Sequence, residues 1–217
     1  MAYFNGGYAF KSNKFSESGI RVIRISDFDK NGIKNEKIVR YPYSNDLLKS
    51  KINISDIDFI SCDENFNEDQ YNDSLCKHLE GSKMMHKTKI SIGGGKGNNI
   101  EPCDILYKNN FIHIKSNGGS SYLSHLFNQA TVSCTFLKDS NFRKKFNKKM
   151  NELKIDYYLN EDFIPSNYNI VLGIITRSGN TNSRPKIPFF SKVSIKYAKE
   201  VIERNLGYKM FIKNIRK

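Results

Sequence analysis

Two short stretches hold side chains whose types and spacing could carry out metal-dependent chemistry on a phosphodiester. The first is Glu101-Pro102-Cys103-Asp104 and the second is Phe111-Ile112-His113-Ile114-Lys115. Both are typical of β-strands, and alternation along a strand puts His113 and Lys115 on one face. If the two strands pair, Asp104, His113 and Lys115 converge. Side chains of these types could serve metal-dependent chemistry, in which a divalent cation polarises a phosphoryl oxygen and activates bound water.

Neighbouring elements supply two further candidates. Glu80, on the preceding helix, is a candidate third metal ligand, and Gln129 is a polar candidate on the following helix. The expected cation is Mg²⁺ or Mn²⁺, and an imidazole ligand favours Mn²⁺ over Mg²⁺. The alternative is structural: His113 packs against its neighbours on the strand face, and Lys115 lies on the surface.

Hydrophobic periodicity predicts the elements that must position these residues. Helices are expected over 68–85, 122–137, 141–153 and 194–205, and strands over 88–92, 100–107, 111–115, 169–176 and 208–212. The alternation predicts an α/β fold with a mixed central sheet flanked by helices. Residues 1–47, with short strands and turns, are expected to form a β-rich appendage to an α/β domain over 48–217.

The arrangement of Asp104, His113 and Lys115 on successive strands resembles the PD-(D/E)XK nuclease core. Gln129 is similar to a glutamine that several of these nucleases carry on the next helix. The resemblance implies a restriction-endonuclease-like core and metal-dependent cleavage of nucleic acid. It also implies that Asp104 and His113 hold the divalent cation, that Lys115 orients or activates the attacking water, and that Gln129 positions the loop or the substrate. The chain departs from the pattern at His113, where the motif has Asp or Glu. This departure implies either an altered set of metal ligands or a fold that has lost cleavage.

Whole phrases are similar to a sporadically distributed bacterial family of uncharacterised proteins found with mobile and defence genes. The similarity covers about residues 60–217, and the phrases are Glu101–Leu106, Phe111–Lys115, Ser120–Gln129 and Pro188–Val193. It implies a defence-linked setting, with subunits of a defence complex as partners. Members of that family are usually longer, so this chain resembles their C-terminal part.

The beginning of the chain resembles a different family. Gly7–Ser12 and Phe15–Phe28 are similar to the opening of a target recognition domain in type I restriction specificity subunits. The similarity covers about residues 6–45. A complete domain of that kind would imply base-specific reading of DNA, whereas a fragment implies shared ancestry or a gene rearrangement.

The charge of +13 lies entirely in the second half of the chain. Residues 1–107 carry 15 basic and 15 acidic side chains, and residues 108–217 carry 20 and 7. Such asymmetry indicates a surface that binds phosphates, with DNA favoured over RNA as the partner. A basic helix is expected to track the phosphate backbone, or else to be a solvated face, through Arg143, Lys144, Lys145, Lys148 and Lys149.

The sequence holds neither a secretory signal nor an apolar run long enough for a membrane span, and its four cysteines form no C-x-x-C pair. These features favour a cytoplasmic protein with reduced thiols and no membrane partner. The predicted function is a defence-associated, metal-dependent DNA nuclease. The alternatives are a non-catalytic DNA-binding module or adaptor of a restriction-modification or phage-defence complex, and a component that binds an acidic protein.

Overall fold

The computed structural model describes residues 52–93, 95, 97–181 and 183–217, together with four short strands of the preceding segment. The chain divides into two units, Met1–Lys51 and Ile52–Lys217. In the first unit β1 pairs with β4 and β2 with β3, all antiparallel; the strands are β1 (Arg21–Val22), β2 (Phe28–Asp29), β3 (Gly32–Ile33) and β4 (Val39–Arg40). The resemblance of residues 6–45 to a target recognition domain otherwise falls outside the described residues.

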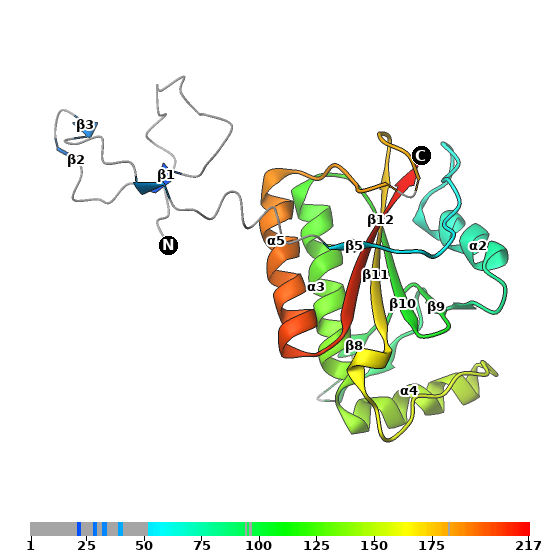
Figure 1. Cartoon of the computed structure of the whole chain (residues 1–217). Helices are drawn as coiled ribbons and strands as arrows, with labels where there is room; N and C mark the ends of the chain where they lie inside the picture. The colour runs from blue at the N-terminus through cyan, green and yellow to red at the C-terminus, as the bar shows by residue number, and fades with distance from the viewer. Residues whose placement is uncertain are drawn as a thin grey trace. The chain divides into compact units, whose positions relative to one another are not determined.

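The second unit is built on a mixed sheet of six strands (Figure 1). In spatial order they are β5 (Asn53–Ile54), β12 (Lys209–Arg216), β11 (Asn169–Thr176), β10 (Asn110–Ser116), β9 (Ile105–Tyr107) and β6 (Lys83–Met84). The first four run parallel to one another, whereas β9 is antiparallel to both β10 and β6. The predicted α/β class with a mixed central sheet is therefore confirmed.

Helices cover both faces of this sheet. On one face lie α3 (Ser120–Leu137) and α5 (Phe189–Lys199), the latter continuing into the π-helical turn η3 (Glu200–Asn205), and on the other lies α2 (Glu68–His78) (Figure 1). Each face has its own core: Phe111 and Leu172 pack with α3 side chains, whereas Ile112 and Ile114 pack with Tyr71 and Leu75 of α2. A further helix, α4 (Ser140–Glu152), and a 3-10 turn, η2 (Pro165–Asn167), follow α3 in the chain.

The sequence located most elements but not all of their ends. The expected helix over 68–85 ends at His78, because Leu79 takes an extended conformation as its C-cap. The expected strand over 100–107 is two strands: β8 (Asn99–Ile100), which forms a hairpin with β7 (Ile90–Ser91), and β9 in the main sheet. Gly207 has φ +85°, the left-handed conformation expected of a glycine that terminates a helix.

One edge of β10 is only partly paired. Its β11 side is paired along its whole length, from Asn110 to Ser116, whereas β9 pairs with Asn110–Ile112 alone. Beyond Ile112, the N–H groups on the β9 side therefore need partners other than a strand.

The four cysteines are free. Among the described helices, none is both long enough and apolar enough to cross a membrane.

Candidate metal centre at the edge of the sheet

Two carboxylates bind the unpaired edge of β10. Oδ2 of Asp104 accepts a hydrogen bond of 2.7 Å from the Ile114 N–H, and Oε1 of Glu68 accepts one of 2.9 Å from the Ser116 N–H. N–H groups two residues apart on one strand edge are roughly 7 Å apart. The side chains of Asp104 and Glu68 therefore lie next to each other, although they are 36 positions apart in the sequence.

The lysine predicted from the sequence lies at the same edge. Nζ of Lys115 is 2.7 Å from Oε2 of Glu68, and both side chains are about a quarter exposed, at 26% and 25%. Lys115 thus contacts a carboxylate and remains open to solvent. Asp104 and Lys115, which the sequence predicted to be close, both lie at this edge of β10, and Glu68 lies there with them.

A histidine that the sequence analysis did not select lies between two carboxylates. Nδ1 of His86 is 3.0 Å from Oδ1 of Asp104, and its Nε2 is 2.8 Å from Oδ1 of Asp69. Lys87 pairs with the other oxygen of Asp69. A neutral imidazole carries a proton on only one ring nitrogen. One ring nitrogen of a neutral imidazole can therefore donate to a carboxylate, while the other is free to bind a cation.

Burial and hydrogen bonding set the charge of these carboxyls. Burial raises the pKa of Asp104, while the hydrogen bonds from the Ile114 N–H and from His86 act in the opposite direction. At Asp69 the hydrogen bond from Lys87 holds the pKa below its usual value. Asp69 is therefore the firmly ionised carboxylate, and its Oδ1 lies 2.8 Å from Nε2 of His86.

The local sequence explains how these groups are positioned. Asn67 and Gln70 form a capping box that fixes the start of α2, so that Glu68 and Asp69 fall in its first turn. Acidic side chains there interact favourably with the positive end of the helix dipole. After β6, the N–H groups of Met85 and His86 both donate to the backbone oxygen of Asp104, which holds His86 beside that residue.

His86 and Asp104, together with Glu101, form a set of side chains that fits a divalent cation. Ligand atoms of His86, Glu101 and Asp104 all lie within 4.8 Å of one another. One imidazole and two carboxylates suit Mn²⁺ or Zn²⁺. Asp69 would act from outside this set, because an outer carboxylate that accepts the second N–H of a ligating histidine fixes its ring and tautomer.

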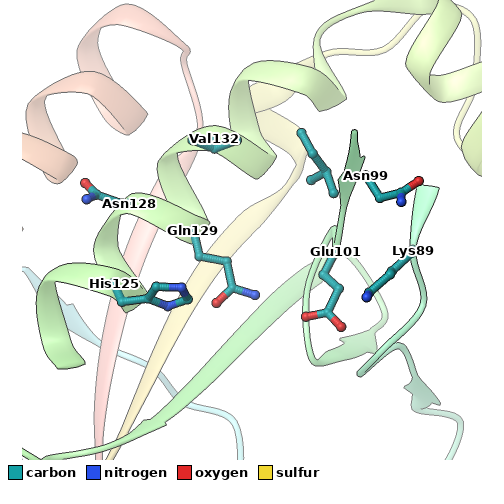
Figure 2. Close-up of a pocket in the computed structure, with 8 residues that line it drawn as sticks. Lys89, Asn99, Glu101, His125, Asn128, Gln129 and Val132 are labelled. Atoms are coloured by element: carbon teal, nitrogen blue, oxygen red, sulfur yellow. The ribbon is translucent and has the colours of Figure 1, made fainter. Parts of the chain in front are cut away.

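Glu101 also lines an open pocket between α3 and the β7–β8 hairpin (Figure 2). Gln129 and His125 project from α3 on one side, and Glu101 and Lys89 lie on the other. Gln129, selected from the sequence, is therefore brought near the metal-capable group through Glu101.

His113 requires a correction. It is fully buried, neither ring nitrogen has a hydrogen-bond partner, and burial lowers its pKa to about 4. Strand alternation places it with Phe111 on the face covered by α3, whereas the Asp104 carboxylate lies at the strand edge. Among the described residues, the group that could share a cation contains His86 and excludes His113.

Glu80 also lies away from this group. It is exposed and follows the end of α2, whereas Glu68 and Asp69 occupy the first turn. The length of α2 therefore separates Glu80 from these two carboxylates, by roughly 15 Å at 1.5 Å per residue. Among the described residues, the third member of the metal-capable group is Glu101.

The basic side chains of α4 lie in two environments, one buried and one exposed. Arg143 is 8% exposed and donates to the backbone oxygens of Leu137, Lys138 and Glu161, with its guanidinium 4.9 Å from the Phe163 ring. It fastens α4 to neighbouring loops, so the expectation that it contacts phosphates is corrected. The other predicted residues remain on the surface: Lys144, Lys145 and Lys148 are exposed, and Lys149 is 3.4 Å from Glu152.

The residues that the sequence analysis missed are Glu68, Asp69, His86 and Glu101. The capping signature of Asn67 and Gln70 could have placed Glu68 and Asp69 at a helix start. Periodicity gave no signal for His86, because it follows a two-residue strand.

Comparison with known proteins identifies one family. The sequence model of a family of unknown function (DUF6119) matches residues 33–216. Neither the curated proteins nor the solved structures include a match to this chain.

Proposed function

This chain belongs to DUF6119, a family of unknown function, and we propose from its own residues that it is a metal-dependent DNA nuclease of degenerate PD-(D/E)XK type. One observation carries the proposal. The carboxylates of Asp104 and Glu68 bind successive free N–H groups at the edge of β10, with Lys115 paired to Glu68.

The order of elements supports the same proposal. A helix (α2) precedes three strands paired in antiparallel succession (β6, β9 and β10), and a second helix (α3) leads to β11, parallel to β10. This order is similar to the restriction-endonuclease core, including the helix that follows the strand with the lysine. Asp104 immediately precedes β9, and Lys115 lies on β10.

Each residue has a definable role. Asp104, Glu101 and His86 would hold the cation, and Asp69 would orient His86 through Nε2. When bound, a divalent cation polarises a phosphoryl oxygen and lowers the pKa of bound water. Lys115, held by Glu68 and partly exposed, is placed to donate a hydrogen bond to a water or to a phosphate oxygen.

The charge distribution favours nucleic acid as the substrate. The second half of the chain carries 20 basic and 7 acidic side chains, which attracts a polyphosphate backbone. A setting in bacterial defence, and partners within a defence complex, belong to the same proposal and rest on the sequence resemblance.

The test is cleavage of plasmid, linear duplex and single-stranded DNA, and of RNA, in Mg²⁺, Mn²⁺ or EDTA. We expect cleavage of DNA in Mn²⁺, none in EDTA, and loss in Lys115→Ala. A matched control is Lys77→Ala, which removes an exposed lysine of α2 and should cleave like the wild type. Equal cleavage by Lys115→Ala and Lys77→Ala would contradict the assigned site.

A second candidate is a non-catalytic DNA-binding module. It is favoured by the burial of His113 at the position where an active motif carries an acid. DNA binding with a steep salt dependence, unchanged by EDTA and without cleavage in either metal, would support this candidate.

A further inference from the structure

The outer face of α5 exposes large aromatic side chains. Phe190 is 72% exposed, Tyr197 69% and Val193 39%. Positions i, i+3 and i+7 lie along one side of a helix, so these three form a single stripe. The opposite side of α5 is buried through Ser191, Ile195 and Ala198. Packing of the domain therefore uses the other side of the helix and does not account for the aromatic stripe.

Lysines flank this stripe. Lys192 is exposed and Lys196 is partly exposed, and they lie one position from Val193 and Tyr197 respectively. From residue 163 to residue 199 the sequence contains neither Asp nor Glu, whereas it contains six basic residues: Arg177, Arg184, Lys186, Lys192, Lys196 and Lys199. α5 itself therefore carries aromatic and cationic side chains and no acidic one, and the acid that follows it, Glu200, pairs with Arg204 at 3.0 Å.

The outer face of α5 begins at the end of the sheet where the candidate metal centre lies. α5 starts beyond the carboxyl end of β11, which runs parallel to β10 (Figure 1). The loop before α5 meets the loop after β10, where Nδ2 of Asn117 is 3.4 Å from the Lys186 oxygen. The start of α5 therefore lies at the same end of the sheet as Ser116, although α5 and α2, which carries Glu68, cover opposite faces.

We propose that the outer face of α5 binds single-stranded DNA, with bases stacked on Phe190 and Tyr197 and phosphates contacted by Lys192 and Lys196. Unpaired bases stack on exposed aromatic rings while cationic side chains follow the backbone. The two rings are about 10 Å apart along the helix axis, at 1.5 Å per residue. A duplex hides the faces of its bases, which selects the single strand. This inference takes DNA as the nucleic acid from the proposed function, and otherwise stands on α5 alone.

The experiment measures binding of the full chain to a fluorescent oligothymidine in EDTA, where metal-dependent cleavage is off. Phe190→Ala and Tyr197→Ala should each weaken binding about tenfold, while Tyr197→Phe retains it. The matched control is Tyr158→Ala, since Tyr158 is 59% exposed and lies outside α5. Lys192→Ala and Lys196→Ala should each reduce the slope of log K against log salt by about 0.7. Thermal unfolding checks that each variant remains folded.

Wild-type affinity for oligothymidine in both aromatic-to-alanine variants would overturn the inference. An equal loss of affinity for a duplex of the same length, which α4 is expected to bind without these rings, would overturn it too. Self-association that is lost in Phe190→Ala, without oligothymidine binding in the wild type, would also overturn it and assign the face to protein contacts. Lys77→Ala, at an exposed lysine in the last turn of α2, should leave binding in EDTA unchanged. Because binding is measured without a divalent cation and cleavage with one, failure of cleavage and failure of α5 binding are separate results.

Discussion

Two histidines near the same strand have opposite surroundings. His86 lies at the open edge of β10, with Nδ1 3.0 Å from Asp104 and Nε2 2.8 Å from Asp69. His113 lies on the face of β10 beneath α3, fully buried and without a hydrogen-bond partner at either ring nitrogen. One environment attracts positive charge and the other rejects it.

The comparison teaches that the edge of a strand, and not only its two faces, can build a site. Alternation assigns side chains to faces, and by that rule His113 was the natural partner of Lys115. The carboxylates of Asp104 and Glu68 instead approach in the direction of the strand hydrogen bonds, because β9 stops pairing after Ile112.

The largest expected effect is on cleavage by Asp104→Asn. The amide keeps the size of the side chain and can still accept from the Ile114 N–H, but it removes the negative charge at the centre. Since loss of an outer partner of a metal ligand typically costs about 10–100-fold, loss of the ligand charge should cost more than about 100-fold in rate. His113→Leu should retain cleavage. Loss of cleavage in His113→Leu with retention in Asp104→Asn would place the metal site at His113 instead.

The next effect is on stability in acid. Burial lowers the pKa of His113 to about 4 from 6.5, so the unfolded chain gains this proton first as pH falls. Stability should therefore decline between pH 6.5 and 4, by about 3 kcal/mol from this residue. Urea unfolding at pH 7 and pH 4 measures the decline, which should be smaller by that amount in His113→Leu. Equal declines in the two proteins would mean that His113 has a polar partner.

A smaller effect is expected outside the metal-capable group. Asp69→Asn leaves His86, Glu101 and Asp104 in place but weakens the acceptor that orients Nε2 of His86. Affinity for Mn²⁺, measured by calorimetry, should fall about tenfold. Asp73→Asn is the matched control, because Asp73 is an exposed acid of the same helix. Equal affinities in the two variants would remove Asp69 from the account.

The smallest effect concerns α4, which also has one buried and several exposed basic side chains. Lys144→Ala or Lys148→Ala should lower the salt dependence of duplex DNA binding by about 0.9 in log–log slope for each lost phosphate contact. Arg143→Met should instead lower the free energy of unfolding by about 1–3 kcal/mol, because three backbone oxygens lose a donor. A larger slope change in Arg143→Met than in Lys144→Ala would place Arg143 on DNA.

The sequence predicted the mixed α/β sheet, the strand over 169–176 and the glycine at 207, because each depends on local periodicity or on backbone conformation. It did not predict the break at Pro102 between β8 and β9, which depends on pairing with different partners. Asp104 and Lys115 were placed together, since adjacent strands are close in sequence. Glu68 and His86 were missed because their approach depends on how α2 and the turn after β6 pack against β10. The interior position of Arg143 could not be read from a run of basic residues.

The most direct test is a Mn²⁺ titration of the wild type, Asp104→Asn and His113→Leu, with binding followed by calorimetry. We expect one Mn²⁺ per chain in the wild type, loss of that site in Asp104→Asn, and unchanged affinity in His113→Leu. Absence of Mn²⁺ binding in the wild type, or its loss in His113→Leu with retention in Asp104→Asn, would contradict a metal centre at the edge of β10.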